Sequence, residues 1–337
     1  MKAVVLTDPS KLEVRDVEKP STSEGEALIR VTHSGICGTD TKIFSGGIPT
    51  PHPLIMGHEM SGVLEEGSSA DGTKPGDRVL VDPVTFCGEC AICKKGQTNL
   101  CINGELLGRD IDGGFAEYCV APSQNIYHLP DDIDDVQAPL IQVLTTVLHA
   151  FNQAGVVDGD IVAILGLGVT GLMQVQLAKA LGASKVICVS RNAHKRGLAE
   201  KFGADVSVTH GEEAKKVVMD MTDGIGADMV IESVGHLSIL AEAIDLARTG
   251  GKIVPFGIYA ADEGKLPFYE FYFKELAIIN ARAAKGEDFI KGIELVRSGA
   301  VDLGPLITHQ VPFTDLAEAI RLLIEPSDER LKIILDH

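Results

Sequence analysis

The stretch DGDIVAILGLGVTGLMQVQLAKALGASKVICVSRN, residues 158–192, decides the fold of this chain. A buried strand is predicted over residues 161–165, a helix with apolar residues four apart follows, and a second strand is predicted over residues 185–189. The turn between the first strand and the helix has the pattern G-x-G-x-x-G, and its candidate cofactor-binding residues are Gly166, Leu167, Gly168, Val169, Thr170 and Gly171. Glycines alone are a weak signal, and an ordinary glycine-rich turn is the alternative. A strand, glycines, a helix and a strand within about 30 residues nevertheless indicate a dinucleotide-binding unit.

The same alternation continues further along the chain. ADMVIESVG, residues 227–235, and GGKIVPFG, residues 250–257, both read as buried strands followed by glycine. Alternating strands and helices predict an α/β fold with a doubly wound parallel sheet. In such a fold the glycines allow close approach of the backbone, and the helix N-terminus holds a pyrophosphate.

The end of the second strand indicates which dinucleotide is bound. Proteins that bind NAD usually have an acidic residue about twenty residues after the glycines, where it grips the ribose hydroxyls. This chain has Ser190 and Arg191 there, with Lys195 and Arg196 shortly afterwards. A hydroxyl and a guanidinium can receive a 2′-phosphate, which a carboxylate would repel. We therefore expect NADP to be preferred, with NAD as the alternative. Lys195 is a further candidate contact, and a solvated basic loop is the other interpretation.

Four of the seven cysteines lie in the phrase CGECAICKKGQTNLC, with the spacing C-x2-C-x2-C-x7-C. An odd number of cysteines argues against a disulfide framework. Four thiolates make the closed tetrahedral shell that structural zinc favours, so the spacing predicts a zinc lobe over residues 87–101. An iron–sulfur cluster and four unrelated thiols are the alternatives. The predicted ligands are Cys87, Cys90, Cys93 and Cys101.

Length and composition limit the remaining classes of protein. A chain of 337 residues exceeds the usual size of a single core, so two domains are expected. The net charge of −18 argues against nucleic acid and anionic membranes as partners. No apolar run is long enough for a transmembrane helix, and the N-terminus reads as a strand and turn rather than a signal peptide. We expect a cytoplasmic protein.

A second group of candidate metal ligands lies in GICGTDTKIFSG (35–46) and GHEMSG (57–62). Taken alone, Cys37 is a core thiol, a nucleophile or a ligand, and a lone histidine is more often structural. Beside a nicotinamide-binding domain, however, Cys37, His58 and Glu59 offer a mixture of donors that zinc accepts. Three protein ligands would leave a position open for a substrate oxygen. Zinc there would make an alcohol more acidic and, in the reverse direction, polarise a ketone.

In order, GICGTD, GHEMSG, the cysteine lobe, DGGFAEY (112–118) and GLGVTG resemble the zinc-dependent alcohol dehydrogenases of the medium-chain dehydrogenase/reductase superfamily. The resemblance covers nearly the whole chain, and the lobe with DGGFAEY is most similar to the polyol, sugar and threonine dehydrogenase branch. It implies a mostly-β, GroES-like catalytic domain over residues 1–145 and a Rossmann NADP-binding domain over residues 146–280. A C-terminal segment, residues 281–337, would return to the catalytic domain.

The resemblance also implies roles for single residues. Cys37 and His58 would be ligands of a catalytic zinc, and Glu59 would be a ligand or a neighbour that exchanges with water or substrate. Thr39 would accept and pass on the proton of the substrate hydroxyl. Asp40 would fix the tautomer of His58, as carboxylates beside zinc-bound histidines commonly do. Thr39 and Asp40 have the alternative role of capping the helix suggested by TDTKIF.

Three positions depart from the pattern of that family. Gln142 stands where relatives usually have a glutamate near the zinc, so its amide oxygen is a candidate ligand that adds no charge. Lys42 stands where some relatives have a relay histidine, and we favour a cofactor contact or a solvated charge over a proton relay. Arg282, in NARAAKG (280–286), is a candidate for contacting the pyrophosphate or the substrate.

These expectations describe an enzyme with two zinc ions per chain that oxidises a secondary alcohol, polyol or sugar hydroxyl, reversibly, with NADP. The alternatives are a zinc-independent quinone or enoyl reductase and a non-enzymatic NADP-binding sensor, neither of which would need the catalytic ligands. The expected partners are a small alcohol or ketone and, by resemblance, further copies of the chain in a homodimer or homotetramer.

Overall fold

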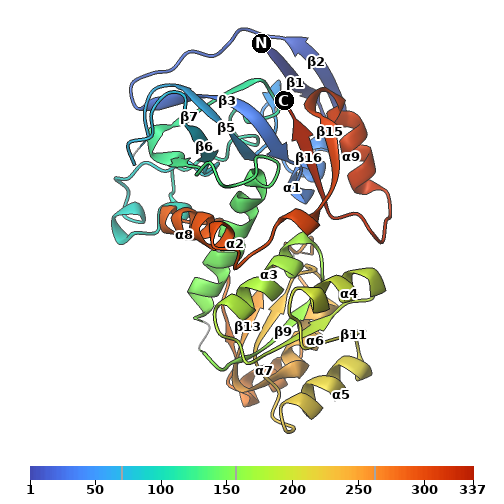
Figure 1. Ribbon diagram of the computed structural model, residues 1–337. Helices are drawn as coiled ribbons and strands as arrows, with labels where there is room; N and C mark the ends of the chain where they lie inside the picture. Colours follow the sequence, from blue (N-terminus) through green and yellow to red (C-terminus); the bar gives the residue numbers. More distant parts are fainter. Residues whose placement is uncertain (70, 156–157, 262) are drawn as a thin grey trace. The chain divides into compact units, whose positions relative to one another are not determined.

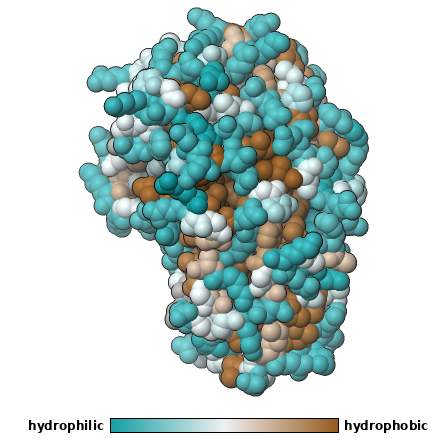
Figure 2. Space-filling model, viewed as in Figure 1, coloured by the Kyte–Doolittle hydropathy of each residue, from teal (hydrophilic) through white to brown (hydrophobic). Residues whose placement is uncertain are grey.

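The computed structural model of the protein describes residues 1–69, 71–155, 158–261 and 263–337, which divide into two compact units (Figure 1). Unit 1 consists of Met1–Thr145, Ala283–Ser298 and Leu303–His337, and unit 2 consists of Thr146–Arg282 and Gly299–Asp302. Figure 2 shows hydrophilic residues spread over the visible face of both units, in keeping with the strong net charge. In the described parts of the chain, no helix has the length and apolar character needed to cross a membrane.

Unit 2 is built on a six-stranded parallel sheet in the order β11-β10-β9-β12-β13-β14. Its strands are β9 (Ile161–Leu165), β10 (Lys185–Val189), β11 (Val206–Val208), β12 (Ala227–Glu232), β13 (Ala247–Pro255) and β14 (Ala277–Ile278). The strands predicted over 161–165 and 185–189 are confirmed with the same bounds. The strand order reverses between β9 and β12, and the carboxyl ends of strands at such a switch point form the usual crevice for a nucleotide.

Helices cover both faces of this sheet (Figure 1). They are α3 (Val169–Ala180), α4 (Ala193–Lys201), α5 (Glu212–Met221), α6 (Leu237–Leu246) and α7 (Phe268–Phe273). Helices α3 and α4 contact each other and β10, whereas α6 contacts α5, α7 and the strands β12 and β13. Leu165, Val189 and Val230 are completely buried in the core beneath α5 and α6. Each such side chain contributes roughly 1.5–3 kcal/mol to folding.

Unit 1 is mostly β-structure. Its larger sheet has the order β15-β16-β3-β5-β6-β8, with β7 also paired to β3, and its smaller sheet has the order β2-β1-β4. The strands are β1 (Lys2–Asp8), β2 (Lys11–Asp16), β3 (Glu26–Gly35), β4 (Leu54–Ile55), β5 (Glu59–Glu66), β6 (Arg78–Val81), β7 (Tyr118–Pro122), β8 (Ile126–His128), β15 (Ile307–Pro312) and β16 (Lys332–Asp336). Strand β16 pairs antiparallel with β3, so the last strand of the chain shares a sheet with an early one.

The remaining α-helices of the described residues are α1 (Gly38–Phe44), α2 (Ala138–Ala154), α8 (Gly286–Arg297) and α9 (Leu316–Ile324). Helix α9 contacts α1, β15 and β16. Its residues Leu316 and Ile320 join Phe115, Met56 and Leu335 in one buried cluster. This cluster packs the segment that precedes residue 58 against the C-terminal strand.

Candidate active site and cofactor sites

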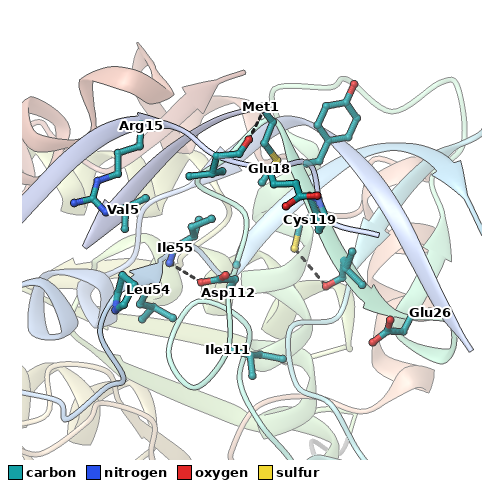
Figure 3. A pocket seen from close by; sticks show the side chains of 16 residues that line it. Met1, Val5, Arg15, Glu18, Glu26, Leu54, Ile55, Ile111, Asp112 and Cys119 are labelled. Atoms are coloured by element: carbon teal, nitrogen blue, oxygen red, sulfur yellow. Dashed lines mark hydrogen bonds between the residues drawn. The ribbon is translucent and has the colours of Figure 1, made fainter. Parts of the chain in front are cut away.

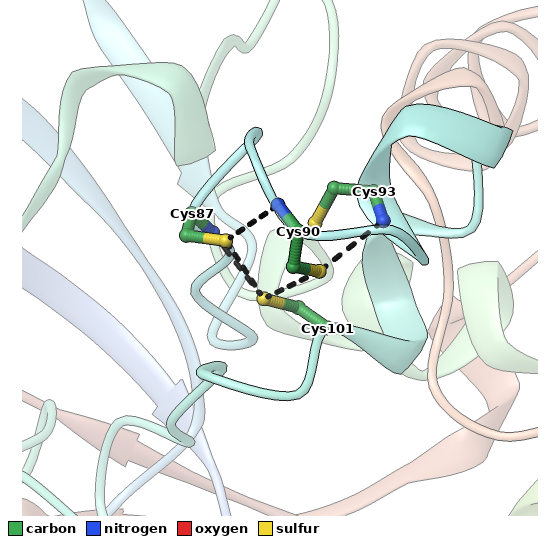
Figure 4. Close-up of side chains that lie close together, drawn as sticks. All are labelled: Cys87, Cys90, Cys93 and Cys101. Atoms are coloured by element: carbon green, nitrogen blue, oxygen red, sulfur yellow. Dashed lines mark hydrogen bonds between the residues drawn. The ribbon is translucent and has the colours of Figure 1, made fainter.

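The four cysteines of the predicted zinc lobe converge on one point, as Figure 4 shows. Their sulfur atoms lie within 4.8 Å of one another. The Sγ of Cys101 is 3.5 Å from that of Cys87 and 4.0 Å from that of Cys90. Gly88 and Gly96 turn the chain at φ of 72° and 76°, a region that glycine adopts without strain.

The separations between these sulfurs fit a single zinc ion. Zinc–sulfur bonds of about 2.3 Å in a tetrahedron place the sulfurs about 3.8 Å apart. An iron–sulfur cluster would need several iron and sulfide ions among the thiolates, and sulfurs this close leave no room for them. Hydrogen bonds from the backbone of Cys93 and Ile102 lower the pKa of Cys90 to about 6, whereas burial raises the pKa of Cys93 to about 12. A dipositive ion would favour the thiolate form of all four.

Cys37, His58 and Glu59 form the second convergent group. Cys37 lies between β3 and α1, Glu59 is the first residue of β5, and His58 directly precedes it. Their ligand atoms lie within 4.8 Å of one another. The antiparallel pairing of β3 with β5 brings them together, since Gly35 lies opposite Glu59 in this ladder. A thiol, an imidazole and a carboxylate that converge in this way are a donor set that zinc accepts.

Asp40 connects two of these side chains. Its Oδ2 accepts a hydrogen bond from the backbone N–H of Cys37 at 2.8 Å, and its Oδ1 lies 3.2 Å from Nδ1 of His58. Burial alone would lower the pKa of His58, but the charge of Asp40 raises it well above its usual range. A carboxylate beside Nδ1 leaves Nε2 to face a metal ion. Asp40 therefore makes both contacts that the sequence offered as alternatives, the helix cap and the histidine partner.

Lys332 is a neighbour of this group that the sequence analysis missed. Its Nζ forms an ion pair with Oε2 of Glu59, and the two side chains are 5% and 2% exposed. Gly35 makes room for the pair, because a Cβ there would lie 2.1 Å from Oε2 of Glu59 and 2.8 Å from Cε of Lys332. The signal that could have found it is a lysine in the otherwise apolar strand KIILD, since buried lysines are almost always paired.

The DGGFAEY segment packs against the loop that carries His58. Its backbone N–H groups donate to the carbonyl oxygens of residues 55–57. A Cβ on Gly113 would lie 2.1 Å from the carbonyl oxygen of Gly57, and a Cβ on Gly57 would lie 2.5 Å from the ring of Phe115. The glycines thus let two backbone segments touch, and the position of His58 depends on them.

Four further candidates have simpler surroundings. Thr39 is half-buried in the first turn of α1, and Lys42 is exposed in its last turn. Gln142 is buried on α2, where its backbone carbonyl oxygen accepts a hydrogen bond from the Thr145 hydroxyl at 2.6 Å. Arg282 is exposed at the end of a segment of unit 2. The roles expected for these four candidate side chains stay predictions.

The glycine-rich turn has the three features that a dinucleotide-binding turn requires. Gly166 turns the chain at φ 101°, Gly168 has open space at its Cβ position, and a Cβ on Gly171 would lie 2.0 Å from the carbonyl oxygen of Gly166. These features correspond to the tight turn, the close approach of a pyrophosphate and the close packing of the helix. Helix α3 begins directly after Gly168, so its N-terminal N–H groups favour an anion there.

The residues expected to distinguish NADP from NAD lie at the carboxyl end of β10. The Ser190 hydroxyl oxygen accepts a hydrogen bond from the N–H of Asn192 at 3.3 Å, and Arg191 is exposed. Arg196 holds this turn by donating to the carbonyl oxygen of Ser190 at 2.8 Å. Lys195 lies in the first turn of α4, where its backbone N–H donates to the side chain of Asn192.

A cavity of about 440 Å³ lies in unit 1 beside the N-terminal strands (Figure 3). Its lining includes Arg15, Glu18, Cys119 and Asp112, and Asp112 accepts a hydrogen bond from the N–H of Ile55 at 2.8 Å. None of the candidate metal ligands is among its described lining residues. The donor set for chemistry therefore lies elsewhere in unit 1.

Comparison with known proteins agrees with this arrangement. Residues 23–131 match the family model of the alcohol dehydrogenase GroES-like domain, and residues 169–298 match that of zinc-binding dehydrogenase. The sorbitol dehydrogenase of Halalkalibacterium halodurans is 31% identical over 99% of each chain. The L-threonine 3-dehydrogenase of Bacillus velezensis is 33% identical over 96% of this chain and 95% of its own.

A solved structure is also similar over the whole length. It is a protein from Sinorhizobium meliloti 1021, described as a zinc-binding dehydrogenase and bound to NADP. It is 32% identical, the match covers 100% of this chain and 99% of the other, and the TM-score is 0.92. The predicted fold class, a GroES-like mostly-β domain with a Rossmann parallel-sheet domain, is confirmed.

Proposed function

Because this chain belongs to the zinc-dependent alcohol dehydrogenase family, we propose that it oxidises a secondary hydroxyl of a polyol or sugar, reversibly, with NADP. The observation that carries the proposal is the convergence of Cys37, His58 and Glu59, with Asp40 beside His58. A zinc-independent quinone or enoyl reductase would not need this donor set, and neither would a protein that only senses NADP. In this proposal unit 1 is the catalytic domain and unit 2 is the NADP-binding domain.

Two zinc ions per chain are proposed, one in each convergent group. Cys37, His58 and Glu59 hold the catalytic ion, with Gln142 as a further candidate ligand, and the cysteine lobe holds the structural ion. When bound, the catalytic zinc would act as a Lewis acid and lower the pKa of a substrate hydroxyl toward neutral pH. The lobe, closed by four sulfurs, leaves no position for a substrate.

The other residues of α1 orient groups or move a proton. Thr39 accepts the proton of the substrate hydroxyl, and its place in the first turn beside Cys37 supports this role. Asp40 keeps the proton of His58 on Nδ1, so that Nε2 remains a donor for the metal. Lys42 is exposed, which suits a cofactor contact better than a proton relay, because a relay must lie within hydrogen-bond reach of the reacting oxygen.

The dinucleotide binds across Gly166–Gly171 in this proposal, with its 2′-phosphate against Ser190 and Arg191. Lys195 and Arg282 are further candidate contacts for its phosphates. Ser190→Asp would place a carboxylate where the 2′-phosphate binds, so the ratio of kcat/KM for NADP to that for NAD is expected to fall at least about tenfold. Ser327→Asp, in an exposed loop of unit 1, is the matched control. An unchanged ratio in the Ser190 variant would refute the cofactor assignment.

The substrate class is proposed from the sorbitol dehydrogenase relative and from the DGGFAEY segment. The substrate class is tested by measuring kcat/KM with NADP for a panel of polyols, sugars, simple secondary alcohols and L-threonine. The highest kcat/KM is expected for a polyol or sugar. A higher kcat/KM for L-threonine would place the protein among the hydroxy amino acid dehydrogenases. The L-threonine 3-dehydrogenase of Bacillus velezensis is also a relative of this chain.

A homodimer or homotetramer is proposed, formed through unit 2. Strand β14 is one edge of the parallel sheet, and helix α7, which precedes it in the chain, exposes the large side chains Phe268, Tyr269, Tyr272 and Phe273. An open sheet edge beside exposed aromatic residues is typical of an interaction surface. Light scattering is expected to give two or four times the chain mass of 35.8 kDa, and Tyr272→Asp is expected to lower it. A wild-type monomer would contradict the proposal.

A cytoplasmic location is proposed on the chemistry of the cysteines. All seven thiols are free, and a zinc lobe requires reduced cysteines. Thiols are kept reduced in the cytosol rather than outside the cell.

Metal analysis of two matched cysteine variants tests the central proposal. The wild type is expected to hold near two zinc ions per chain, and Cys37→Ser and Cys101→Ser are each expected to hold one. Cys37→Ser is expected to lose activity but keep its thermal stability, whereas Cys101→Ser is expected to unfold at a lower temperature. Loss of zinc from Cys37→Ser with unchanged activity would refute the scheme. One zinc ion in the wild type would favour the reductase or the sensor.

A further inference from the structure

One buried carboxylate ties together the two loops that follow β12 and β13. Glu232, the last residue of β12, is completely buried. Its Oε1 accepts hydrogen bonds from the N–H groups of Val234 at 2.8 Å and Gly235 at 2.9 Å. Its Oε2 accepts a hydrogen bond from the hydroxyl of Tyr259 at 2.5 Å. Its own carbonyl oxygen accepts from the N–H groups of residues 256 and 257, so both loops converge on this residue.

These loops touch each other and the glycine-rich turn with almost no free space. A Cβ on Gly166 would lie 2.7 Å from Cγ2 of Val234. A Cβ on Gly257 would lie 2.1 Å from the backbone nitrogen of Gly235. Because the backbones of the two loops meet at Gly257 and Gly235, a shift of one loop must displace the other.

The two loops present apolar side chains at the edge where the parallel strands end. Val234 and Ile258 are 50% and 71% exposed. The hydroxyl of Ser233 donates to Oε1 of Gln174 at 2.7 Å, which ties the first loop to helix α3. Exposed apolar side chains in fixed loops beside a dinucleotide-binding turn are suited to contact a flat, weakly polar ring.

We propose that Tyr259 is a positioning residue for the dinucleotide, because its bond to Glu232 holds both loops in the arrangement that receives the nicotinamide half. The proposal rests on the proposed function in one respect, that a nicotinamide dinucleotide binds at the Gly166–Gly171 turn. Tyr259 acts through Glu232 and takes no part in the chemistry. Partial burial and the bond to Glu232 raise the pKa of Tyr259, so its hydroxyl stays protonated and donates.

Tyr259→Phe removes this hydrogen bond while keeping the ring that packs against the core of unit 2. NADPH binding to the zinc-loaded protein, followed by nucleotide fluorescence, is expected to weaken about tenfold, as for the loss of a hydrogen bond to a charged group. The KM for the cofactor is expected to rise, with kcat and zinc content unchanged. Tyr118→Phe, in unit 1, is the matched control and is expected to bind NADPH like the wild type.

Hydrogen exchange of the cofactor-free protein reports on the loops themselves. The backbone amides of residues 233–235 and 256–259 are expected to exchange faster in Tyr259→Phe than in the wild type, because the hydrogen bond between Tyr259 and Glu232 is lost. Unchanged exchange in these residues would overturn the proposal, as would equal NADPH affinity for the variant and the wild type.

A double-mutant cycle tests whether Tyr259 acts through Glu232. Glu232→Gln keeps an amide oxygen for the N–H groups of Val234 and Gly235 but removes the charge. The effects of the two substitutions on NADPH affinity are expected to be non-additive in the double variant, and additive effects would overturn the proposal. A wild-type protein that binds neither NADPH nor NADH would instead contradict the proposed function.

Discussion

Lys332 and Glu59 form an ion pair in the interior of unit 1, beside Cys37 and His58. The Glu59 carboxylate therefore faces a lysine on one side and the candidate metal ligands on the other. An unpaired buried charge is strongly unfavourable. Lys332 thus supplies a partner for Glu59 when no metal ion does, which supports its expected role as an exchangeable neighbour of the zinc.

Replacing Lys332 with Met leaves Glu59 buried without its lysine. The zinc-free protein is expected to lose about 3–5 kcal/mol of stability, as when one partner of a buried ion pair is removed. The zinc-loaded protein is expected to lose less, since the metal also balances the carboxylate. Thermal unfolding with chelator and with excess zinc measures both, and Lys332→Arg, which keeps the charge, is the control. Equal losses with and without zinc would mean that Glu59 interacts with the lysine alone.

Replacing Asp40 with Asn keeps an acceptor for the N–H of Cys37 but removes the charge beside His58. The affinity of the catalytic site for zinc is expected to fall about 10–100-fold, the usual effect of losing a carboxylate that orients a histidine ligand. Competition with a coloured chelator measures it, and the cysteine lobe is an internal reference within the same protein. Asp77→Asn, which alters another aspartate that accepts a backbone N–H, controls for the charge change. Wild-type zinc affinity in Asp40→Asn would exclude this role of the carboxylate.

Replacing Gly113 with Ala would push a methyl group into the backbone of the loop that carries His58. The free energy of unfolding is expected to fall by about 1–3 kcal/mol, the usual cost of inserting extra atoms into a well-packed interior. The variant is also expected to lose the catalytic zinc, because His58 is displaced. Gly197→Ala is the control, because its Cβ would meet nothing within 4 Å in helix α4, and it is expected to stabilise the protein by about 0.5–1 kcal/mol. The unfolding midpoint and the zinc content per chain are measured together. Full zinc occupancy in Gly113→Ala would show that the close packing does not position His58.

The stability of the protein is expected to depend on pH through Asp82. Burial, with a further contribution from the charge of Asp288, raises the pKa of Asp82 from 3.8 to about 7. Between these values the folded chain holds a proton that the unfolded chain has released. The contribution of Asp82 to stability is therefore full below about pH 4 and decreases by about 4 kcal/mol as the pH rises through 7.

Asp82→Asn tests this dependence, because the amide is neutral at every pH and its oxygen still accepts the hydrogen bond from the N–H of Val84. The unfolding midpoint of the variant is expected to rise relative to the wild type between pH 5 and pH 8. A constant difference across that range would refute the shifted pKa.

The nucleotide-binding half of the structure was predictable because its signals are local. The apolar runs that became β9 and β10 and the glycines between them lie in one continuous stretch, so periodicity and turn chemistry define the unit. The four-cysteine lobe is local in the same sense, since its ligand spacing lies within one short loop. For Cys37 and His58 the residue types indicated a metal site, but spacing along the chain could not show that they meet.

The sequence by itself determined the Rossmann unit, the cysteine lobe and the identity of the candidate ligands, because neighbouring residues encode strands, turns and ligand spacing. Only the tertiary structure decided what surrounds those ligands. Lys332 reaches Glu59 because β16, from the far end of the chain, pairs with β3. Tyr259 reaches Glu232 because the neighbouring parallel strands β12 and β13 end at the same edge of the sheet. Such contacts depend on which strands pair and in which register, and register is set by the burial of whole sheets rather than by any short stretch.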